Sequence, residues 1–288
     1  MEKFKPMSWY IGTEWKLPSK GLRKQVLSLD NYNQLVKPHL FSKVAIKIED
    51  VENLNGRESR YLSNELLGQE QKVEMGSSLT PVDCYVELLV RQLVAGERAR
   101  CYISTKGEDI TFILTLLKIH ETKEIHKLNA AEIYALALRY KENGVAMFKQ
   151  YPIFAHDYFA RAAKVLISYK PFENLSASSD SVSGEAMKLL FTQIQTNLAA
   201  CLLSEERFED VIYQTKFVEE EANSTEKSVY RRAMAFYQLK EYEKAQKLIE
   251  SIPNYQEKKE FFKLHQRLAE SWKSSNEQYK NLVKRMFN

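Results

Sequence analysis

Three polar side chains in the C-terminal half have the spacing of a binding surface. Lys227 and Arg231 are four residues apart, so on a helix their side chains lie on one face. Asn197 lies 34 residues before Arg231, which gives the two residues equivalent places in a chain that repeats with that period. Two cations and an amide donor suit an acidic peptide terminus, because charge-assisted hydrogen bonds to carboxylate are the strong ones. Side chains of these types could bind an acidic peptide. A different peptide, or solvated helix residues without a function, are the alternatives.

The remaining residue types that could carry chemistry form weaker patterns. The three cysteines include no pair at metal-ligand or redox spacing, which is typical of a reducing compartment. Four potential metal ligands lie close together in the sequence: His120, Glu121, Glu124 and His126. They match no recognised ligand pattern, so a solvated linker is the favoured interpretation. There is no Gly-rich phosphate loop or nucleophile elbow, and we expect no metal, no cofactor and no catalytic residue.

Length and composition indicate the broad class of protein. The chain has 288 residues, which is enough for two domains of roughly 100–200 residues each. Hydrophobic residues make up 44% and charged residues 28%, as in ordinary globular proteins, and a net charge of +4 is too small to indicate nucleic-acid binding. Residues 1–10 lack the apolar stretch of a secretory signal, and the longest mostly apolar run, 110–119, is too short to span a bilayer. We expect a soluble cytoplasmic or nuclear protein that binds neither nucleic acid nor membrane.

Before about residue 120 the pattern is that of a sheet with one helix. Apolar and polar residues alternate with a period of two in three segments, as in strands with one buried face. The apolar rows are Val44, Ile46, Ile48; Ala99, Cys101, Ile103; and Ile110, Phe112, Leu114, Leu116. Between the first two rows, Thr80 is a suitable helix N-cap, Pro81 suits the first turn, and Asp83 completes the start signal. We therefore predict an antiparallel sheet covered by one helix.

After about residue 127 the period becomes helical and the sequence repeats. Phe208 and Tyr242 are 34 residues apart, as are Ala199 and Ala233, and this is the length of the tetratricopeptide (TPR) helix-turn-helix unit. Gly144 supplies the small first-helix residue of the first unit. The second helices carry small or apolar residues at steps of four and three: Ala155, Phe159, Ala162; Val211, Thr215, Val218; and Ala245, Ile249, Ile252. Small residues at a helix crossing let the backbones approach closely.

These patterns predict an α+β protein of two domains. Residues 1–125 form the sheet domain, and residues 128–288 form an all-α TPR superhelix. The three repeats and the capping helix are expected at about 130–170, 185–222, 225–253 and 256–287. Residues 176–184 (SASSDSVSG) predict a long loop between helices, with a cluster of regulatory phosphosites as the alternative. For the last helix, a calmodulin-type target is the alternative to a cap.

In their order and spacing, four segments resemble the FKBP-type immunophilins that carry a C-terminal TPR domain. Residues 23–27 (RKQVL) are similar to the opening strand of that family's isomerase domain, and residues 94–100 (VAGERAR) to the turn and strand after its helix. Residues 110–117 (ITFILTLL) are similar to its closing strand, and residues 279–287 to the family's final helix. The resemblance covers nearly the whole chain and implies an FKBP-like domain followed by a protein-binding TPR domain.

The same resemblance implies that the first domain is not an active prolyl isomerase. Such an enzyme needs a deep aromatic pocket that stabilises a twisted amide, whose rotation barrier is about 18–20 kcal/mol. The family's pocket-floor Trp is absent from Thr80–Val86, where Tyr85 is the only aromatic residue, and Ile48 replaces a pocket Tyr. Only Ser104–Asp109 separates the last two strands, so the family's long loop is missing, and Phe112, which keeps a matching aromatic ring, is assigned to the core. An active isomerase is the alternative function.

In co-chaperones of this family, five residues form a clamp for the acidic C-terminal tail of a chaperone. The resemblance puts Lys141, Val145, Asn197, Lys227 and Arg231 at the clamp positions. The family uses Asn in place of Val145 to hold the terminal carboxylate. Leaving a desolvated carboxylate without one of its donors costs about 1–3 kcal/mol of binding free energy, which is roughly 5–150-fold in affinity. The candidate peptide-binding residues are therefore Lys141, Asn197, Lys227 and Arg231.

Together, these observations predict a non-catalytic adaptor, or scaffold, that binds partner proteins through the TPR groove and the surface of the FKBP-like domain. The non-catalytic members of the family, which the chain resembles most, imply a casein-kinase-type protein kinase as the partner and a role in circadian rhythm. The retained clamp residues imply the C-terminus of an Hsp90-type chaperone as an alternative partner, which would make the protein a co-chaperone.

Overall fold

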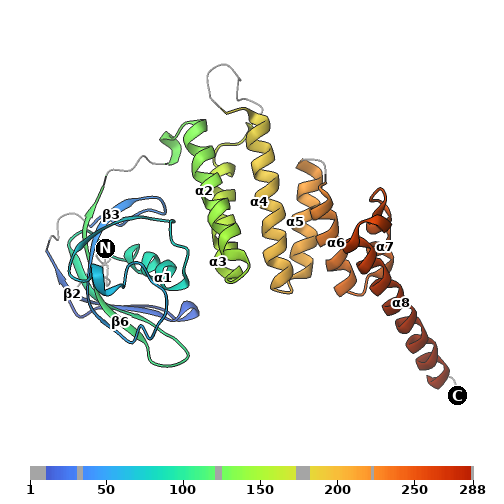
Figure 1. Cartoon of the computed structure of the whole chain (residues 1–288), viewed down its shortest axis with the longest axis horizontal. Coiled ribbons are helices and arrows are strands. Elements are labelled where there is room, and N and C mark those ends of the chain that lie inside the picture. Colours follow the sequence, from blue (N-terminus) through green and yellow to red (C-terminus); the bar gives the residue numbers. More distant parts are fainter. Residues whose placement is uncertain (1–10, 31–34, 121–124, 173–181, 222–223, 287–288) are drawn as a thin grey trace, which may run out of the picture. The chain divides into compact units, whose positions relative to one another are not determined.

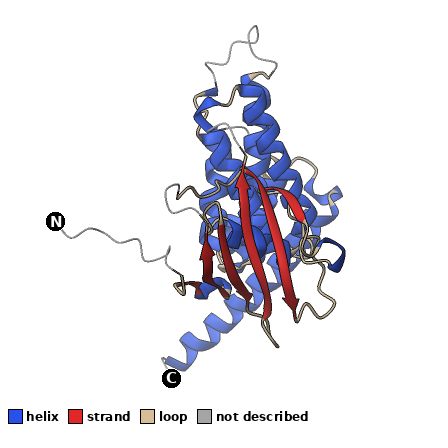
Figure 2. Ribbon diagram, turned by 90° about the vertical axis from the view of Figure 1, so that its left-hand side faces the viewer, coloured by secondary structure: helices blue, strands red, loops and turns tan. Residues whose placement is uncertain are grey.

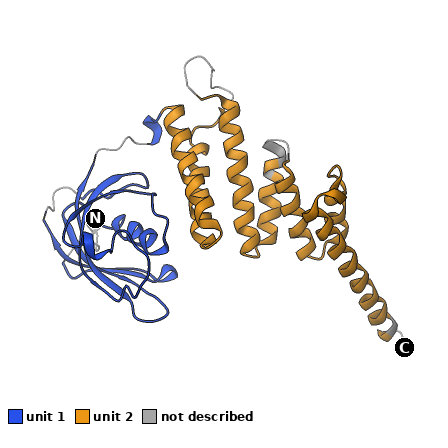
Figure 3. Ribbon diagram, viewed as in Figure 1, with its two compact units in different colours: residues 1–128 blue, residues 129–288 orange. Residues whose placement is uncertain are grey.

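The structure of the protein is a computed structural model that describes residues 11–30, 35–120, 125–172, 182–221 and 224–286. The chain forms two compact units, Met1–Leu128 and Asn129–Asn288, which Figure 3 colours separately. The first contains the sheet, and the second is helical. The α+β fold class predicted from the two hydrophobic periods is therefore confirmed.

Unit 1 is built on a six-stranded antiparallel sheet, within the described residues, with the strand order β1-β2-β5-β6-β3-β4. Its strands are β1 (Glu14–Leu17), β2 (Leu22–Leu29), β3 (Lys43–Glu52), β4 (Glu70–Glu74), β5 (Glu97–Ile103) and β6 (Ile110–Ile119). The sheet curves around helix α1 (Pro81–Val90) in Figure 1, and Figure 2 shows its strands in red. This is the sheet covered by a helix that the sequence predicts.

The alternating rows of the sequence form the inner face of this sheet. Ile46, Ile48 and Phe112 are at most 1% exposed and belong to one core cluster with side chains of α1. Thr80 caps α1 as predicted, because its Oγ1 accepts a hydrogen bond from the Asp83 N–H at 3.2 Å. The cap satisfies one of the free N–H groups in the first turn and places the apolar face of α1 against the sheet.

The two edge strands, β1 and β4, are the part of the sheet that the sequence pattern does not predict. Strand β1 pairs with β2, and strand β4 pairs with β3. Both are short, and in β4 only Gln71 and Val73 are buried. An edge strand of this length has too few inward side chains for a period of two to stand out.

Unit 2 is a succession of helices joined in pairs. The helices are α2 (Ala130–Phe148), α3 (Pro152–Ile167), α4 (Gly184–Ser204), α5 (Phe208–Glu221), α6 (Glu226–Gln238), α7 (Tyr242–Glu250) and α8 (Lys259–Met286). Consecutive helices pack against each other, and Figure 1 shows them following one another along the unit. Phe208 and Tyr242 are the first residues of α5 and α7, so the 34-residue spacing joins equivalent helix starts. The predicted helix-turn-helix repeat is thus present.

The last helix begins later than the sequence predicts. It starts at Lys259 rather than at residue 256, because Asn254 has a left-handed backbone and Tyr255–Glu257 form a short 3-10 turn. Three of its side chains pack into one cluster with α6 and α7: Phe261, Leu264 and Leu268. Helix α8 therefore covers the end of the last pair. No helix in the described ranges is long and apolar enough to cross a membrane.

Some predicted features fall outside the described ranges. Residues 173–181 hold most of the predicted loop at 176–184, and Ser183 after them caps α4 by accepting a hydrogen bond from the Ala186 N–H at 3.2 Å. Glu121 and Glu124 of the candidate metal cluster are also outside. Where the chain is described, no group of three or more His, Cys, Asp or Glu side chains could hold a metal ion.

A candidate peptide-binding groove

The first helices of the three pairs, α2, α4 and α6, together line two neighbouring hollows. We refer to the two hollows together as the groove. Helix α4 contacts both α2 and α6, and the hollows share the lining residues Phe148, Ala200 and Arg231. In a repeat array, residues one period apart take matching places on neighbouring units. This is why Asn197 and Arg231, 34 residues apart, reach the same hollow.

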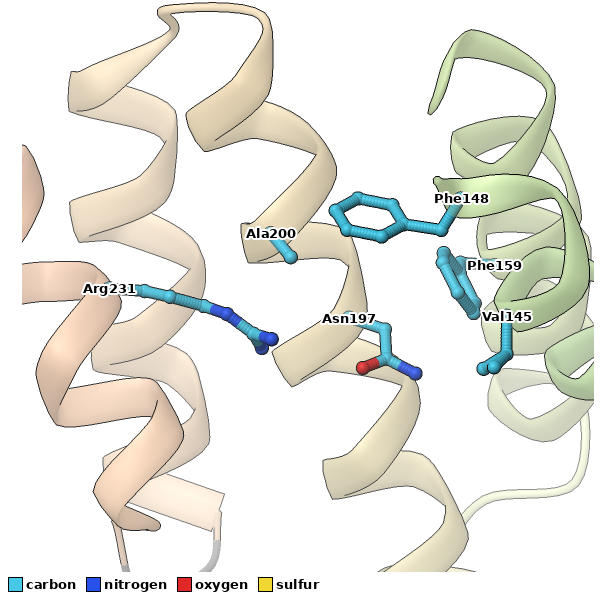
Figure 4. Close-up of a pocket in the computed structure, with 6 residues that line it drawn as sticks. All are labelled: Val145, Phe148, Phe159, Asn197, Ala200 and Arg231. Carbon is cyan, nitrogen blue, oxygen red and sulfur yellow. The ribbon is translucent and has the colours of Figure 1, made fainter. Parts of the chain in front are cut away.

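The smaller hollow has an apolar side and a polar side (Figure 4). Its volume is about 130 Å³. Its lining comes from α2 (Val145, Phe148), α3 (Phe159), α4 (Asn197, Ala200) and α6 (Arg231). In Figure 4 the side chains from α2 and α3 lie on one side of Asn197, and Arg231 extends towards it from the other. The hollow can therefore cover an apolar group while donating hydrogen bonds to an oxygen beside it.

Arg231 is partly buried between α6 and α4. Its Nη1 donates a hydrogen bond to the carbonyl oxygen of Thr196, so the side chain fastens one first helix to the next. Burial lowers the pKa of Arg231, yet a guanidinium remains charged at neutral pH. A guanidinium has five N–H donors, so one bond leaves others for a ligand. Arg231 is both a structural tie and a positive charge at the border of the two hollows.

The larger hollow lies between α4, α6 and α8 and has a volume of about 640 Å³. Tyr230 and Phe261 line it and form an edge-to-face aromatic pair with ring centroids 5.4 Å apart. Glu226, also in the lining, is ion-paired with Lys258 at 2.5 Å. Lys227 is exposed and has no hydrogen bond or ion pair with the described part of the chain. Its ammonium is therefore available to an acidic ligand.

The structure brings together three of the four candidate residues. Asn197, Lys227 and Arg231 line the two hollows, whereas Lys141 lines neither of them. The Lys141 ammonium instead donates a hydrogen bond to Oε1 of Gln193 on α4, at 2.7 Å. This bond joins α2 to α4, and each of its two residues lies four positions before a residue of the smaller hollow, Val145 or Asn197.

Several groove residues were not predicted from the sequence, among them Phe148, Ala200 and Phe261. Phe148 follows Val145 by three residues, and Ala200 follows Asn197 by three, so each pair lies on one helix face. That spacing is a signal by which both could have been found. Phe261 carries no such signal, because it comes from the capping helix and reaches the groove only through tertiary packing.

In unit 1, the side chains that the resemblance compares with an isomerase pocket lie in the core or pack against it. Ile48 and Phe112 are 0% and 1% exposed and lie in the same cluster as Met75. Tyr85 of α1 is half-buried against that cluster. Strands β5 and β6 are joined by Ser104–Asp109 alone. Since protein interiors are close-packed, the buried Ile48 and Phe112 contribute to the packing of this core.

Two buried carboxylates of unit 1 hold its backbone and leave no free charge. Glu87 accepts a hydrogen bond from the Gly76 N–H at 2.6 Å. Glu97 is ion-paired with Lys24 and accepts a hydrogen bond from the Val94 N–H at 3.1 Å. Groups that are engaged in this way stabilise loops, and their burial has a structural explanation without catalysis.

The buried thiols are not nucleophiles. Burial raises the pKa of the Cys101 thiol, and it raises the pKa of Cys201 to about 12. Because the thiolate is the reactive form, both groups stay protonated and inert at neutral pH.

An FKBP-like sheet unit followed by a TPR unit defines the class of FKBP–TPR proteins. The family described as "BDBT FKBP like N-terminal" matches residues 15–121, and the family described as "Bride of doubletime-like, TPR domain" matches residues 129–213. The chain belongs to the Bride of doubletime-like family.

Known relatives match along the whole chain. Protein Bride of doubletime of Drosophila melanogaster is 53% identical over 286 residues, which is 98% of this chain and 100% of that protein. A crystal structure of residues 1–211 of a related protein is 51% identical and has a TM-score of 0.62, over 70% of this chain and 98% of that one. The resemblance to FKBP-type proteins with a TPR domain is therefore confirmed.

Proposed function

We propose that the protein is a non-catalytic adaptor that binds partner proteins through the groove of α2, α4 and α6. The proposal is carried by the convergence of Asn197, Lys227 and Arg231 on two hollows that also have apolar walls. Repeat arrays of this type use such surfaces to bind other proteins, so a TPR domain implies protein–protein interaction. The outer surface of unit 1 offers a second partner a place to bind.

The partner that we propose is a casein-kinase-type protein kinase, in keeping with the resemblance to non-catalytic FKBP-type proteins. Holding a kinase needs no chemistry from the adaptor, only a surface that binds one segment of the kinase or of its substrate. A role in circadian rhythm, in the cytoplasm or nucleus, belongs to this proposal.

A co-chaperone of the Hsp90 type is the second candidate function. The observation in its favour is the exposed ammonium of Lys227, which has no partner among the described residues and lies one helical turn from Arg231. Such a charge suits an acidic peptide tail. Val145 weighs against it, because a valine side chain donates no hydrogen bond to a terminal carboxylate.

The double variant Lys227→Ala/Arg231→Ala is expected to weaken partner binding by about tenfold or more, because each charge-assisted contact is worth about 1.5–3 kcal/mol. Calorimetry with the full chain would compare two ligands: a casein-kinase-type catalytic domain and an acidic chaperone C-terminal pentapeptide. The ligand that binds the wild type but not the double variant indicates which of the two functions the groove serves.

The matched control is Lys247→Ala, which removes a cation from α7 outside both hollows. Because Arg231→Ala also removes the bond to Thr196, the melting temperature of the double variant is measured, and Lys227→Ala is tested alone. Wild-type affinity for both ligands in a folded double variant would rule out the groove as the binding site.

We also propose that unit 1 lacks prolyl isomerase activity, and the burial of Ile48 and Phe112 supports this. A proline-peptide isomerisation assay is expected to give the uncatalysed rate, which corresponds to tens to hundreds of seconds at 25 °C. An active FKBP-type isomerase at the same concentration is the positive control. A faster rate that Tyr85→Ala abolishes would contradict the proposal.

A further inference from the structure

We propose that the smaller hollow takes one branched aliphatic side chain from an internal, acidic segment of the partner, and not the carboxylate at the end of a chain. The inference rests on the proposed function and specifies the chemistry of the bound segment. Four properties of the groove carry it: its apolar wall, its size, its polar side, and the position of the Lys227 charge.

The wall at α2 is apolar where a terminal carboxylate would need a donor. Val145 is 55% exposed, and Phe148 and Ala200 line the same hollow beside it. Covering exposed apolar surface is favourable by about 25 cal/mol per Å², whereas a charged carboxylate placed there without a donor is penalised. This wall therefore selects an apolar side chain.

The volume of the hollow limits the size of that side chain. The hollow measures about 130 Å³. A cavity of about 150 Å³ holds a benzene ring. A leucine, isoleucine or valine side chain, each smaller than a benzene ring, therefore fits.

The polar side of the hollow suits a chain that continues in both directions. Asn197 presents an amide, and Arg231 has N–H donors besides the one bonded to Thr196. Such donors pair with the backbone carbonyl oxygens that flank a bound side chain. A segment that continues in both directions, with neutral amides on each side of the bound residue, is therefore accommodated here.

The unpaired ammonium of Lys227 sets where the acidic residue must lie. Lys227 and Arg231 are four residues apart on α6, which is about 6 Å along a helix axis. An extended peptide advances about 3.3–3.6 Å per residue, and its side chains at i and i+2 point the same way. An acidic side chain two positions from the aliphatic residue therefore reaches Lys227, and one at the adjacent position points away.

Three labelled peptides test this spacing by fluorescence polarisation with the full chain. The first is acetyl-Glu-Ser-Leu-Ser-Glu-amide, which has an acid two positions away on each side of leucine. The second, acetyl-Ser-Glu-Leu-Glu-Ser-amide, has the same composition and charge with the acids adjacent. The third is the first sequence with a free C-terminal carboxylate. The first peptide is expected to bind about tenfold tighter than the second and no more weakly than the third.

Two surface variants separate the parts of the site. Val145→Asn is expected to weaken binding of the first peptide about tenfold and to strengthen binding of the third, which has a free carboxylate. The reason is that the substitution replaces part of the apolar wall by a hydrogen-bond donor. Lys227→Ala is expected to remove the preference between the two spacings. Lys247→Ala, on α7, is the control that should change nothing.

Several results would overturn the inference while leaving the adaptor function standing. One such result is that the wild type binds the third peptide, with its free carboxylate, more tightly than the first. Another is that the first and second peptides, which differ in spacing, bind equally well. A third is that no peptide binds at about 1 mM. In each case, if the double variant Lys227→Ala/Arg231→Ala no longer bound a partner protein, that result would still support the groove as an adaptor site. If the partner protein also binds that variant normally, the proposed function fails as well.

Discussion

Replacement of Glu97 by alanine is expected to lower the free energy of unfolding of unit 1 by about 3–5 kcal/mol. Glu97 and Lys24 form an ion pair in which each side chain is only 1% exposed. Without Glu97, the Lys24 ammonium stays buried beside the Gln92 carbonyl oxygen, its acceptor at 2.8 Å, and the Val94 N–H loses an acceptor at 3.1 Å. The uncompensated buried charge accounts for most of the cost.

Hydrogen exchange of the β5 amides, measured at increasing urea concentration, would give this loss of stability. The α6 amides of unit 2 serve as an internal reference. The variant Lys24→Met/Glu97→Leu is expected to recover most of the stability, because neither charge then remains buried. Glu14→Ala is the matched surface control: its pairs with Lys16 and Arg23 are exposed, and no measurable change is expected. A loss for Glu97→Ala as small as that of Glu14→Ala would show that the pair is not needed.

Replacement of Gly144 by valine is expected to destabilise unit 2 by about 1–3 kcal/mol, because it overpacks the contact between α2 and α3. A Cβ at Gly144 would lie 2.6 Å from Cε1 of Phe159 and 2.9 Å from two further ring atoms. Phe159 is 1% exposed and packed on most sides, so its ring can yield only by displacing neighbours or by moving into the smaller hollow. Valine is better than glycine as a helix former by less than about 1 kcal/mol, so the clash decides the sign. The smaller hollow, which Phe159 lines, should change shape too.

Thermal unfolding with hydrogen exchange of the α2 and α3 amides would measure the effect. Phe159→Leu in the Gly144→Val background is expected to cost less than the sum of the two single changes, because the smaller side chain makes room for the added methyl groups. Gly107→Val is the control, since a Cβ added at Gly107 meets nothing within 4 Å. Strict additivity of the two changes would contradict the proposed clash.

The fold class followed from periods that are local in the sequence. A period of two over 44–48 and 110–116 placed Ile46, Ile48 and Phe112 in the core, because alternate strand residues point to one face of a sheet. The edge strands β1 and β4 could not be predicted from this periodicity. An edge strand is defined by the neighbour it lacks, and that depends on how the whole sheet is assembled.

The candidate site was predicted in part for the same reason. Asn197 and Arg231 could be paired from the sequence, since repeats contact their neighbours in a constant way and a 34-residue shift maps one unit onto the next. Lys141 also lies on a first helix, but it is hydrogen-bonded to Gln193 and does not line either hollow. Which partner a long, flexible side chain finds depends on contacts that the spacing along one helix does not contain.

By itself, the sequence determined a sheet domain followed by TPR repeats, the cap at Thr80, and the cationic character of a groove on the first helices. The tertiary structure decided that Arg231 ties α6 to α4, that Lys227 remains unpaired among the described residues, and that Phe261 of α8 lines the larger hollow. The division has one physical cause. Hydrophobic periods and repeat lengths are properties of neighbouring residues, whereas the shape and charge of a groove depend on which side chains from distant helices share one space.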